Sequence, residues 1–266
     1  MMAGRRRYSV LTILVVALTL TARAAAGSVD RISSNLDCHE PLRNPCCPAM
    51  RQRAPEQFSA KFGTNYGPFV ATCIRQRAPV WVDRVYNLMR LGYYDANFIP
   101  RVLNTTHLKI AQFGTAGDPT ISNIYNYTTS SNPQCAILKP QPPNMPYCDA
   151  LKPCAGFASL SNTFGTISMS TGQDKASGQT WNATAELFIN LGDNSWLDKL
   201  LFVPICTVDT PSMERTVRAF PSFGELADMG GPGPSLGMLY ELGNHYIEAN
   251  KSWAAMAQTT AVRMLR

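Results

Sequence analysis

Short hydrophobic segments separated by turn residues occur early in the chain and predict β-strands. Residues 58–62 and 69–74 are rich in apolar side chains, and the six residues between them include two glycines and a proline. Two strand-length segments around such a turn are typical of a β-hairpin. We therefore expect a hairpin over residues 58–74.

A helical pattern follows this hairpin. Pro79 is a residue that favours the first turn of a helix, and few helix-breaking residues come after it. Apolar residues then recur mostly at helical intervals, at Val80, Val82, Val85, Tyr86, Met89 and Leu91. The pattern predicts an amphipathic helix from Pro79 to Leu91.

Further apolar segments have the length of single strands, and most are bounded by Gly, Pro, Asn or Asp. They are residues 98–103, 108–113, 164–169, 187–190 and 201–208. A second helix is expected from Met238 to Ala257. Many short strands with one or two helices indicate a mainly β fold, in which an antiparallel sheet closes into a barrel.

Three other segments lack such patterns. Residues 27–55 combine helix-breaking prolines with three cysteines, which indicates a Cys-rich N-terminal extension. Residues 118–162 form a long loop rich in Pro, Ser and Asn that carries three more cysteines, so we expect disulfides to hold it. Residues 228–237 are rich in Gly and Pro and lead into the expected C-terminal helix.

The N-terminus is typical of a secretory signal. Three arginines at positions 5–7 precede the apolar residues 10–20, and the small residues 24–27 follow. This order predicts a signal peptide with cleavage near Ala26; an uncleaved membrane anchor is the alternative. The expected organisation is a signal peptide at 1–26, the Cys-rich extension at 27–55, the barrel at 56–212 and a C-terminal Gly/Pro-rich segment with a helix at 213–266.

Cysteines and glycosylation sequons agree with secretion. The even number of cysteines predicts disulfides in an oxidising compartment rather than a metal site, although the pairing stays open among 105 connectivities. The candidates are Cys38, Cys46, Cys47, Cys73, Cys135, Cys148, Cys154 and Cys206. The Asn-x-Ser/Thr sequons, which are candidate glycosylation sites, are at Asn104, Asn126, Asn182 and Asn250.

Composition and charge exclude several classes of protein. With 45% apolar and 16% charged residues, the chain is neither disordered nor a coiled coil. Four of its 24 basic residues lie within the first 26 positions, which contain no acid, so 20 basic and 18 acidic residues remain. This near balance argues against a nucleic-acid partner.

One hydrolase-like motif has no supporting context. Residues 233–237 read Gly-Pro-Ser-Leu-Gly, which fits the pattern Gly-x-Ser-x-Gly. That motif needs a strand before the serine and a helix after it, and Gly and Pro precede it here. Phosphate-binding and metal-binding motifs are lacking as well, so we treat the match as accidental.

Seven fragments in order instead resemble the cyclophilins. They are residues 78–95 ending in Gly-Tyr-Tyr-Asp, Phe-Ile-Pro-Arg-Val-Leu at 98–103, Ile-Ala-Gln-Phe-Gly at 110–114, Gly-Thr-Ile-Ser-Met at 165–169, 186–198 ending in Trp-Leu-Asp, Phe-Val-Pro-Ile-Cys-Thr-Val at 202–208 and Glu-Leu-Gly-Asn-His-Tyr at 241–246. The resemblance extends from about residue 57 to residue 246.

This resemblance implies a closed eight-stranded antiparallel barrel capped by two α-helices. It also implies peptidyl-prolyl cis-trans isomerase (rotamase) activity without a cofactor or a metal. Arg101 would be the catalytic residue. The implied substrate-binding residues are Gln112, Ile110, Met169, Phe188, Trp196, Leu197 and Ile205. Cyclosporin-type ligands would bind at the same place.

The resulting hypothesis is a secreted isomerase that assists protein folding in the secretory pathway or outside the cell. Its substrates would be proline-containing polypeptides, and no stable membrane anchor is expected after signal cleavage. The ER lumen and a membrane-anchored form are alternative locations. A proline-peptide binding module with weak turnover is the alternative function, because Lys109, Glu186 and an insertion after Arg101 depart from the family pattern.

Overall fold

The computed structural model describes residues 38–125, 160–173, 180–200 and 202–265. The expected signal peptide, Asn126, Cys135, Cys148 and Cys154 lie outside these residues, so the interpretations that rest on them stay predictions. No helix in the described ranges combines the length and the apolar character needed to cross a membrane.

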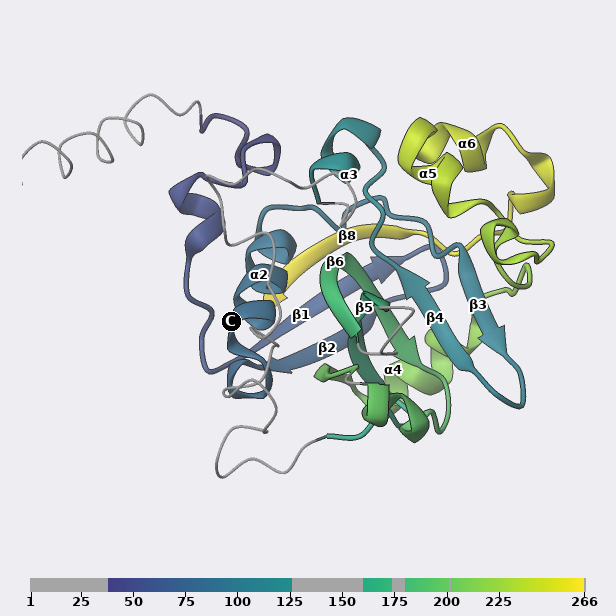
Figure 1. Ribbon diagram of the computed structural model, residues 1–266, viewed down its shortest axis with the longest axis horizontal. Helices are drawn as coiled ribbons and strands as arrows, with labels where there is room; N and C mark the ends of the chain where they lie inside the picture. Colours follow the sequence, from purple (N-terminus) through teal and green to yellow (C-terminus); the bar gives the residue numbers. More distant parts are fainter. Residues whose placement is uncertain (1–37, 126–159, 174–179, 201, 266) are drawn as a thin grey trace, which may run out of the picture. The chain divides into compact units, whose positions relative to one another are not determined.

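An antiparallel sheet of eight strands dominates the described residues (Figure 1). Its strands are β1 (Gln57–Thr64), β2 (Phe69–Ile74), β3 (Arg101–Asn104), β4 (Lys109–Phe113), β5 (Thr166–Gln173), β6 (Thr180–Asn190), β7 (Pro204–Val208) and β8 (Thr259–Leu265). They pair in the order β3-β4-β6-β5-β7-β2-β1-β8. The expected mainly β fold is confirmed, including the hairpin and the five strand-length segments.

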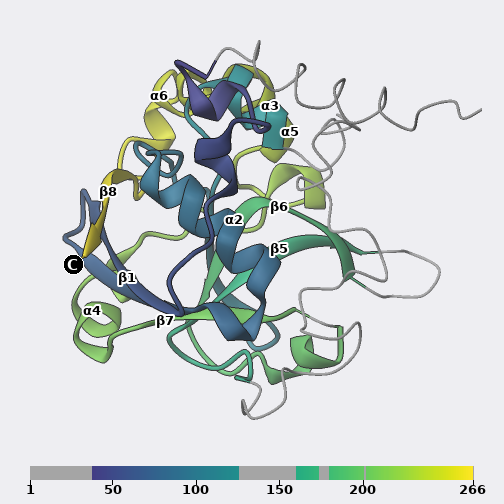
Figure 2. The same ribbon diagram turned by 90° about the vertical axis from the view of Figure 1, so that its left-hand side faces the viewer.

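Helices accompany the sheet in larger number than expected. The described residues contain α2 (Pro79–Arg90), α3 (Pro119–Tyr125), α4 (Thr210–Arg215), α5 (Leu236–Leu242) and α6 (Asn244–Glu248). The helix that hydrophobic periodicity predicted is α2, which contacts β6 and β8 and crosses the sheet in Figure 2. α3 contacts α5, and α5 contacts α6.

Aromatic side chains from the hairpin form part of the core. Phe62 on β1 and Phe69 on β2 are register partners, and their rings stack with centroids 4.7 Å apart. The ring of Phe113 on β4 packs edge-on against Phe62. All three side chains are buried, so alternate residues of these strands hold the sheet around one apolar interior.

The sheet is curled but open, which corrects the expected closed barrel. β3 pairs with β4 and β8 pairs with β1, and the described strands show no ladder between β3 and β8. The two edges meet at an isolated bridge between Phe98 and Gln258. Along β3, the hydroxyl of Ser222 donates to the carbonyl oxygen of Val102 at 2.5 Å. The chain after β7 therefore covers this edge, and β8 does not pair with it.

The C-terminal region also differs from the prediction. Residues 238–257 do not form one helix, because α5 and α6 are separated at Gly243, whose φ is +62°. A Cβ atom at Gly243 would clash with the carbonyl oxygen of Gly117, so the close approach requires glycine. Beyond α6, the chain returns to the sheet as β8, a strand that the sequence did not suggest.

Disulfides confirm the interpretation of the described cysteines. Cys38 is bonded to Cys47 within the N-terminal extension, and Cys73 on β2 is bonded to Cys206 on β7. Cys46 is disulfide-bonded as well. None of the cysteines in the described ranges is free.

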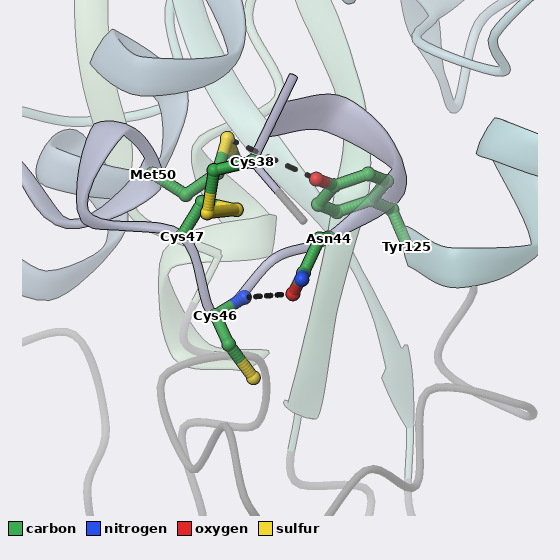
Figure 3. Close-up of a disulfide and its surroundings, with 6 residues drawn as sticks. All are labelled: Cys38, Asn44, Cys46, Cys47, Met50 and Tyr125. Atoms are coloured by element: carbon green, nitrogen blue, oxygen red, sulfur yellow. Dashed lines mark hydrogen bonds between the residues drawn. A yellow bond between two sulfur atoms is a disulfide. The ribbon is translucent and has the colours of Figure 1, made fainter. Parts of the chain in front are cut away.

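The Cys-rich extension is packed against the helices rather than extended from the domain. Figure 3 shows Tyr125 of α3 beside the Cys38–Cys47 bond, with its hydroxyl 3.9 Å from the sulfur of Met50. The same hydroxyl donates to the carbonyl oxygen of Leu42 at 3.0 Å. Because Tyr125 is buried, these contacts fix the extension on the domain.

Candidate functional site

Arg101 and Gln112 lie directly opposite each other on β3 and β4. Arg101 Nη1 donates to Gln112 Oε1 at 2.9 Å. The insertion after Arg101 does not separate them, because it forms the turn between the strands. There Thr105 N donates to the carbonyl oxygen of Leu108 at 3.1 Å, and Leu108 N donates to Thr105 Oγ1 at 3.0 Å.

A second partner holds the other edge of the Arg101 guanidinium. Glu225 lies after β7, 124 residues along the chain from Arg101, and its Oε2 accepts from Nη2 at 2.7 Å. Nε lies 2.6 Å from Oε1, an ion-pair contact outside hydrogen-bonding geometry. The Arg101 side chain is 12% exposed and that of Glu225 is 31% exposed. Two elements far apart in sequence therefore hold one largely buried cation.

Glu186 on β6 does not pair directly with Arg101, because Gln112 lies between them. Gln112 Nε2 donates to Glu186 Oε2 at 2.7 Å, and the Tyr240 hydroxyl of α5 donates to Glu186 Oε1 at 2.6 Å. Burial raises the pKa of Glu186, while these two hydrogen bonds and the charge of Arg101 oppose that rise. Burial and Glu186 hold the pKa of Tyr240 well above its usual value, so Tyr240 stays a donor.

The raised pKa of Glu186 predicts a pH dependence of stability. Between the ordinary carboxyl pKa and the raised one, the folded state binds more protons than the unfolded state, so stability falls as pH rises through this window. Replacing Glu186 by Gln removes this titration, so the free energy of unfolding of Glu186→Gln should decrease less with pH than that of the wild type. Urea unfolding between pH 4 and pH 8 measures the difference. Glu241→Gln on the exposed face of α5 is the control; a parallel pH dependence in wild type and Glu186→Gln would contradict the assignment.

An apolar cavity of about 390 Å³ opens beside Arg101. Its polar lining residues are Arg101, Gln112, Ser170, Thr184 and Glu186, and its apolar lining residues are Leu108, Ile110, Phe188, Trp196, Leu197, Phe202, Met229 and Leu236. Ile110, Phe188 and Leu197 belong to one buried cluster, against which Leu108 and Phe202 pack. The cavity therefore offers a mainly apolar compartment whose lining includes the Arg101 guanidinium.

Trp196 forms an exposed part of the cavity wall. It lies in the 3₁₀ helix Ser195–Leu200, and its side chain is fixed by a 3.0 Å hydrogen bond from Nε1 to the carbonyl oxygen of His107. It remains 47% exposed. An indole held by its polar end presents its apolar face to whatever enters the cavity.

The structure brings together six of the eight site residues that the sequence suggested, namely Arg101, Gln112, Ile110, Phe188, Trp196 and Leu197. Met169 and Ile205 are fully buried and do not line the cavity. Met169 precedes the lining residue Ser170 on β5, at a register shift in the pairing with β6; its side chain lies in the core, while Ser170 lines the cavity. Lys109 lines a separate cavity with Asn104 and Arg218.

Sequence reasoning missed the contribution of the chain after β7. Met229 and Leu236 lie in the segment noted only for its Gly and Pro, Tyr240 lies in the expected C-terminal helix, and no sequence signal singled out Glu225. Ser235 of the Gly-x-Ser-x-Gly match is the N-cap of α5, where its hydroxyl accepts from Met238 N at 3.1 Å. This serine therefore has a structural role in the helix.

Comparisons with known proteins identify the family. Residues 59–220 match the family described as cyclophilin type peptidyl-prolyl cis-trans isomerase/CLD. No curated protein matches the chain.

Solved structures give weak similarities. A cyclophilin type peptidyl-prolyl cis-trans isomerase from Cryptosporidium parvum is 16% identical with a TM-score of 0.47, covering 79% of this chain and 98% of that one. Its structure in the presence of the dipeptide Ala-Pro is 15% identical with a TM-score of 0.47, covering 78% of this chain and 99% of that one. The Mimivirus cyclophilin is 12% identical with a TM-score of 0.45, covering 80% of this chain and 92% of that one.

Proposed function

Because the chain belongs to the cyclophilin type peptidyl-prolyl cis-trans isomerase family, which matches more than half of it, we propose that it catalyses rotation about X-Pro peptide bonds. The reaction takes place in the cavity beside Arg101. It makes and breaks no covalent bond, so it needs neither a nucleophile nor a cofactor. The substrates are polypeptides that present a proline in an accessible segment.

The chemistry required is modest and fits the residues. Peptide-bond rotation has a barrier of about 18–20 kcal/mol, and X-Pro is the bond whose two isomers are close in free energy. The apolar cavity holds the proline ring. In the twisted amide the nitrogen loses conjugation, and the Arg101 guanidinium donates to its lone pair or to the carbonyl oxygen. Each tenfold increase in rate needs about 1.4 kcal/mol of preferential binding to this transition state.

The observation that carries the proposal is a guanidinium fixed at an apolar cavity. Both Gln112 and Glu225 hold Arg101, so its donors are oriented before substrate binds. A preorganised donor stabilises developing charge without reorganisation at the moment of reaction. An arginine free to move on the surface would not do so.

Isomerisation of a short X-Pro peptide tests the proposal. The oxidised chain from residue 27 to residue 266 is mixed with the peptide, and cis-trans exchange is followed by NMR. We expect the exchange rate to exceed the spontaneous rate at substoichiometric protein. A wild-type protein that adds nothing to the spontaneous rate contradicts the proposal.

A binding module with little turnover is the second candidate, because the Arg101 charge is already paired with Glu225. It would shift peptide resonances without enhancing exchange, and rapid catalysis by the wild type would exclude it. Both candidates place a ligand beside Trp196, so a cyclosporin-type ligand is expected to change Trp196 fluorescence.

We place this activity in the secretory route or outside the cell, where the protein assists folding. The disulfides of Cys38, Cys46, Cys47, Cys73 and Cys206 support an oxidising compartment. Asn104 is exposed at the end of β3, so it is accessible to glycosylation, and Asn250 is half-buried. Asn182 lies in β6.

A further inference from the structure

Glu225 belongs to a part of the chain that the family match does not include, since that match ends at Phe220. The segment from residue 221 to residue 236 nevertheless reaches the cavity, where Met229 and Leu236 line the wall. Within this segment, Glu225 is the acidic residue that pairs with Arg101. The segment therefore adds a residue to the site that the matched domain lacks.

The contacts of Arg101 leave part of its guanidinium available. An arginine side chain carries five N–H donors in a fixed plane. Glu225 faces the edge formed by Nε and Nη2, and Gln112 accepts from Nη1. Nε–H makes no hydrogen bond but faces the Glu225 carboxylate, and one further N–H remains on Nη1 and one on Nη2. The two partners thus fix the plane of the guanidinium without using all the donors that a substrate amide needs.

We propose that Glu225 is a positioning residue for Arg101, which turns the free N–H donors toward the cavity. This inference rests on the proposed isomerase function. Glu186 is the other acid that attracts Arg101, and it lies deeper, behind Gln112. Without Glu225, the guanidinium can turn toward Glu186 or toward water, and its donors no longer point at a bound amide.

The Gly-rich stretch after β7 is built around the backbone of Glu225. Gly233 N donates to the Glu225 carbonyl oxygen at 2.8 Å, and a Cβ atom at Gly231 would clash with that same oxygen. Leu226 N donates to Glu225 Oε1 at 2.8 Å. The tight packing explains why glycine occupies these positions, and it fixes the carboxylate on Arg101.

The Gly-rich loop is fixed in turn at its other end. Asp228 accepts from the Ser235 hydroxyl at 2.9 Å, and Ala227 N donates to the carbonyl oxygen of Pro234 at 3.1 Å. Gly231 N donates to the carbonyl oxygen of Leu226 at 2.9 Å. The loop is therefore closed on itself, so Glu225 is presented by a stiff support rather than by a mobile tail.

Glu225→Gln tests the positioning role, because it keeps the size of the side chain and removes its charge. We expect kcat/KM for a short X-Pro peptide to fall about tenfold, while the Kd of the same peptide, measured by NMR titration, changes less than twofold. The matched control is Glu214→Gln, which breaks the exposed ion pair between Glu214 and Arg218 and should keep wild-type kcat/KM.

A second variant tests the same contact without changing Glu225. Gly231→Ala should displace the Glu225 backbone and cause a similar loss of kcat/KM at unchanged Kd, with the NMR signal of Arg101 Nε–H shifted in both variants. An unchanged or higher rate in Glu225→Gln would overturn the inference, because Glu225 would then compete with substrate for Arg101. An inactive wild type contradicts the isomerase itself, and the Arg101 signal would still report whether Glu225 positions the side chain.

Discussion

Arg101→Ala should lower the catalysed rate of X-Pro isomerisation by about 10²- to 10³-fold, the loss typical of removing one preorganised donor from an active site. Among the described residues that line the cavity, Arg101 carries the only positive charge. Alanine leaves the apolar wall in place, so peptide still binds while the twisted amide loses its donor. Exchange NMR gives the rate, and peptide titration gives the Kd.

Stability distinguishes this loss from unfolding. Arg101→Ala takes a partner from the buried Gln112 and from the partly exposed Glu225, so we expect some loss of stability, and the rate is measured at a temperature where the melting curve shows the variant fully folded. Arg101→Lys keeps the charge but lacks the planar fork of donors that holds both partners and faces the amide together, so it should recover little of the rate. Arg263→Ala removes an exposed arginine paired with Asp95 at 3.2 Å and is the control. A rate for Arg101→Ala within twofold of the wild type would refute the catalytic role.

Local patterns predicted the elements that depend on neighbouring residues. The hairpin of β1 and β2 and the helix α2 follow from apolar spacing and turn residues, and each lies where the sequence placed it. Arg101 and Gln112 were suggested by family resemblance, and they face each other because β3 and β4 form one hairpin. For this half of the site, the family resemblance supplied the residues, and the local hairpin explains why they meet.

The other half depends on contacts that no local pattern encodes. Glu225 and Tyr240 meet Arg101 and Glu186 across 124 and 54 residues of sequence, and only the folded chain brings them together. β8 was missed for a similar reason, since its pairing with β1 determines that it is a strand. The contact between Ser222 and the edge strand β3 is likewise long-range and has no sequence signature.

The Gly-rich stretch illustrates how one pattern can support two interpretations. Its sequence fits the hydrolase motif Gly-x-Ser-x-Gly, but the structure places Ser235 at a helix N-cap, and Gly231 and Gly233 lie against the backbone of Glu225. The glycines are required by close packing rather than by a nucleophile. The physical reason for glycine at these positions was therefore visible only once the position of Glu225 was known.

Loss of the Cys73–Cys206 disulfide should have the largest effect on stability. The two cysteines are register partners on β2 and β7, both are fully buried, and the bond closes a loop with a sequence separation of 133. Restricting so long a loop in the unfolded chain is worth about 5 kcal/mol in the chain-entropy model. Cys73→Ala/Cys206→Ala should therefore unfold at a much lower urea concentration.

The size of this loss follows from loop length, which supplies the control. The Cys38–Cys47 bond has a sequence separation of only 9, so Cys38→Ala/Cys47→Ala should cost about 2–3 kcal/mol. Because β7 pairs with β5, which carries Ser170 of the cavity, unfolding after loss of the longer bond also removes the site. For a domain of this size, 5 kcal/mol corresponds to a fall of roughly 10–20 °C in the melting temperature. If the two double variants had the same melting temperature, closure of the longer loop would not be what stabilises the sheet. The stability of the sheet would then have to come from the packing around Phe62 and Phe69.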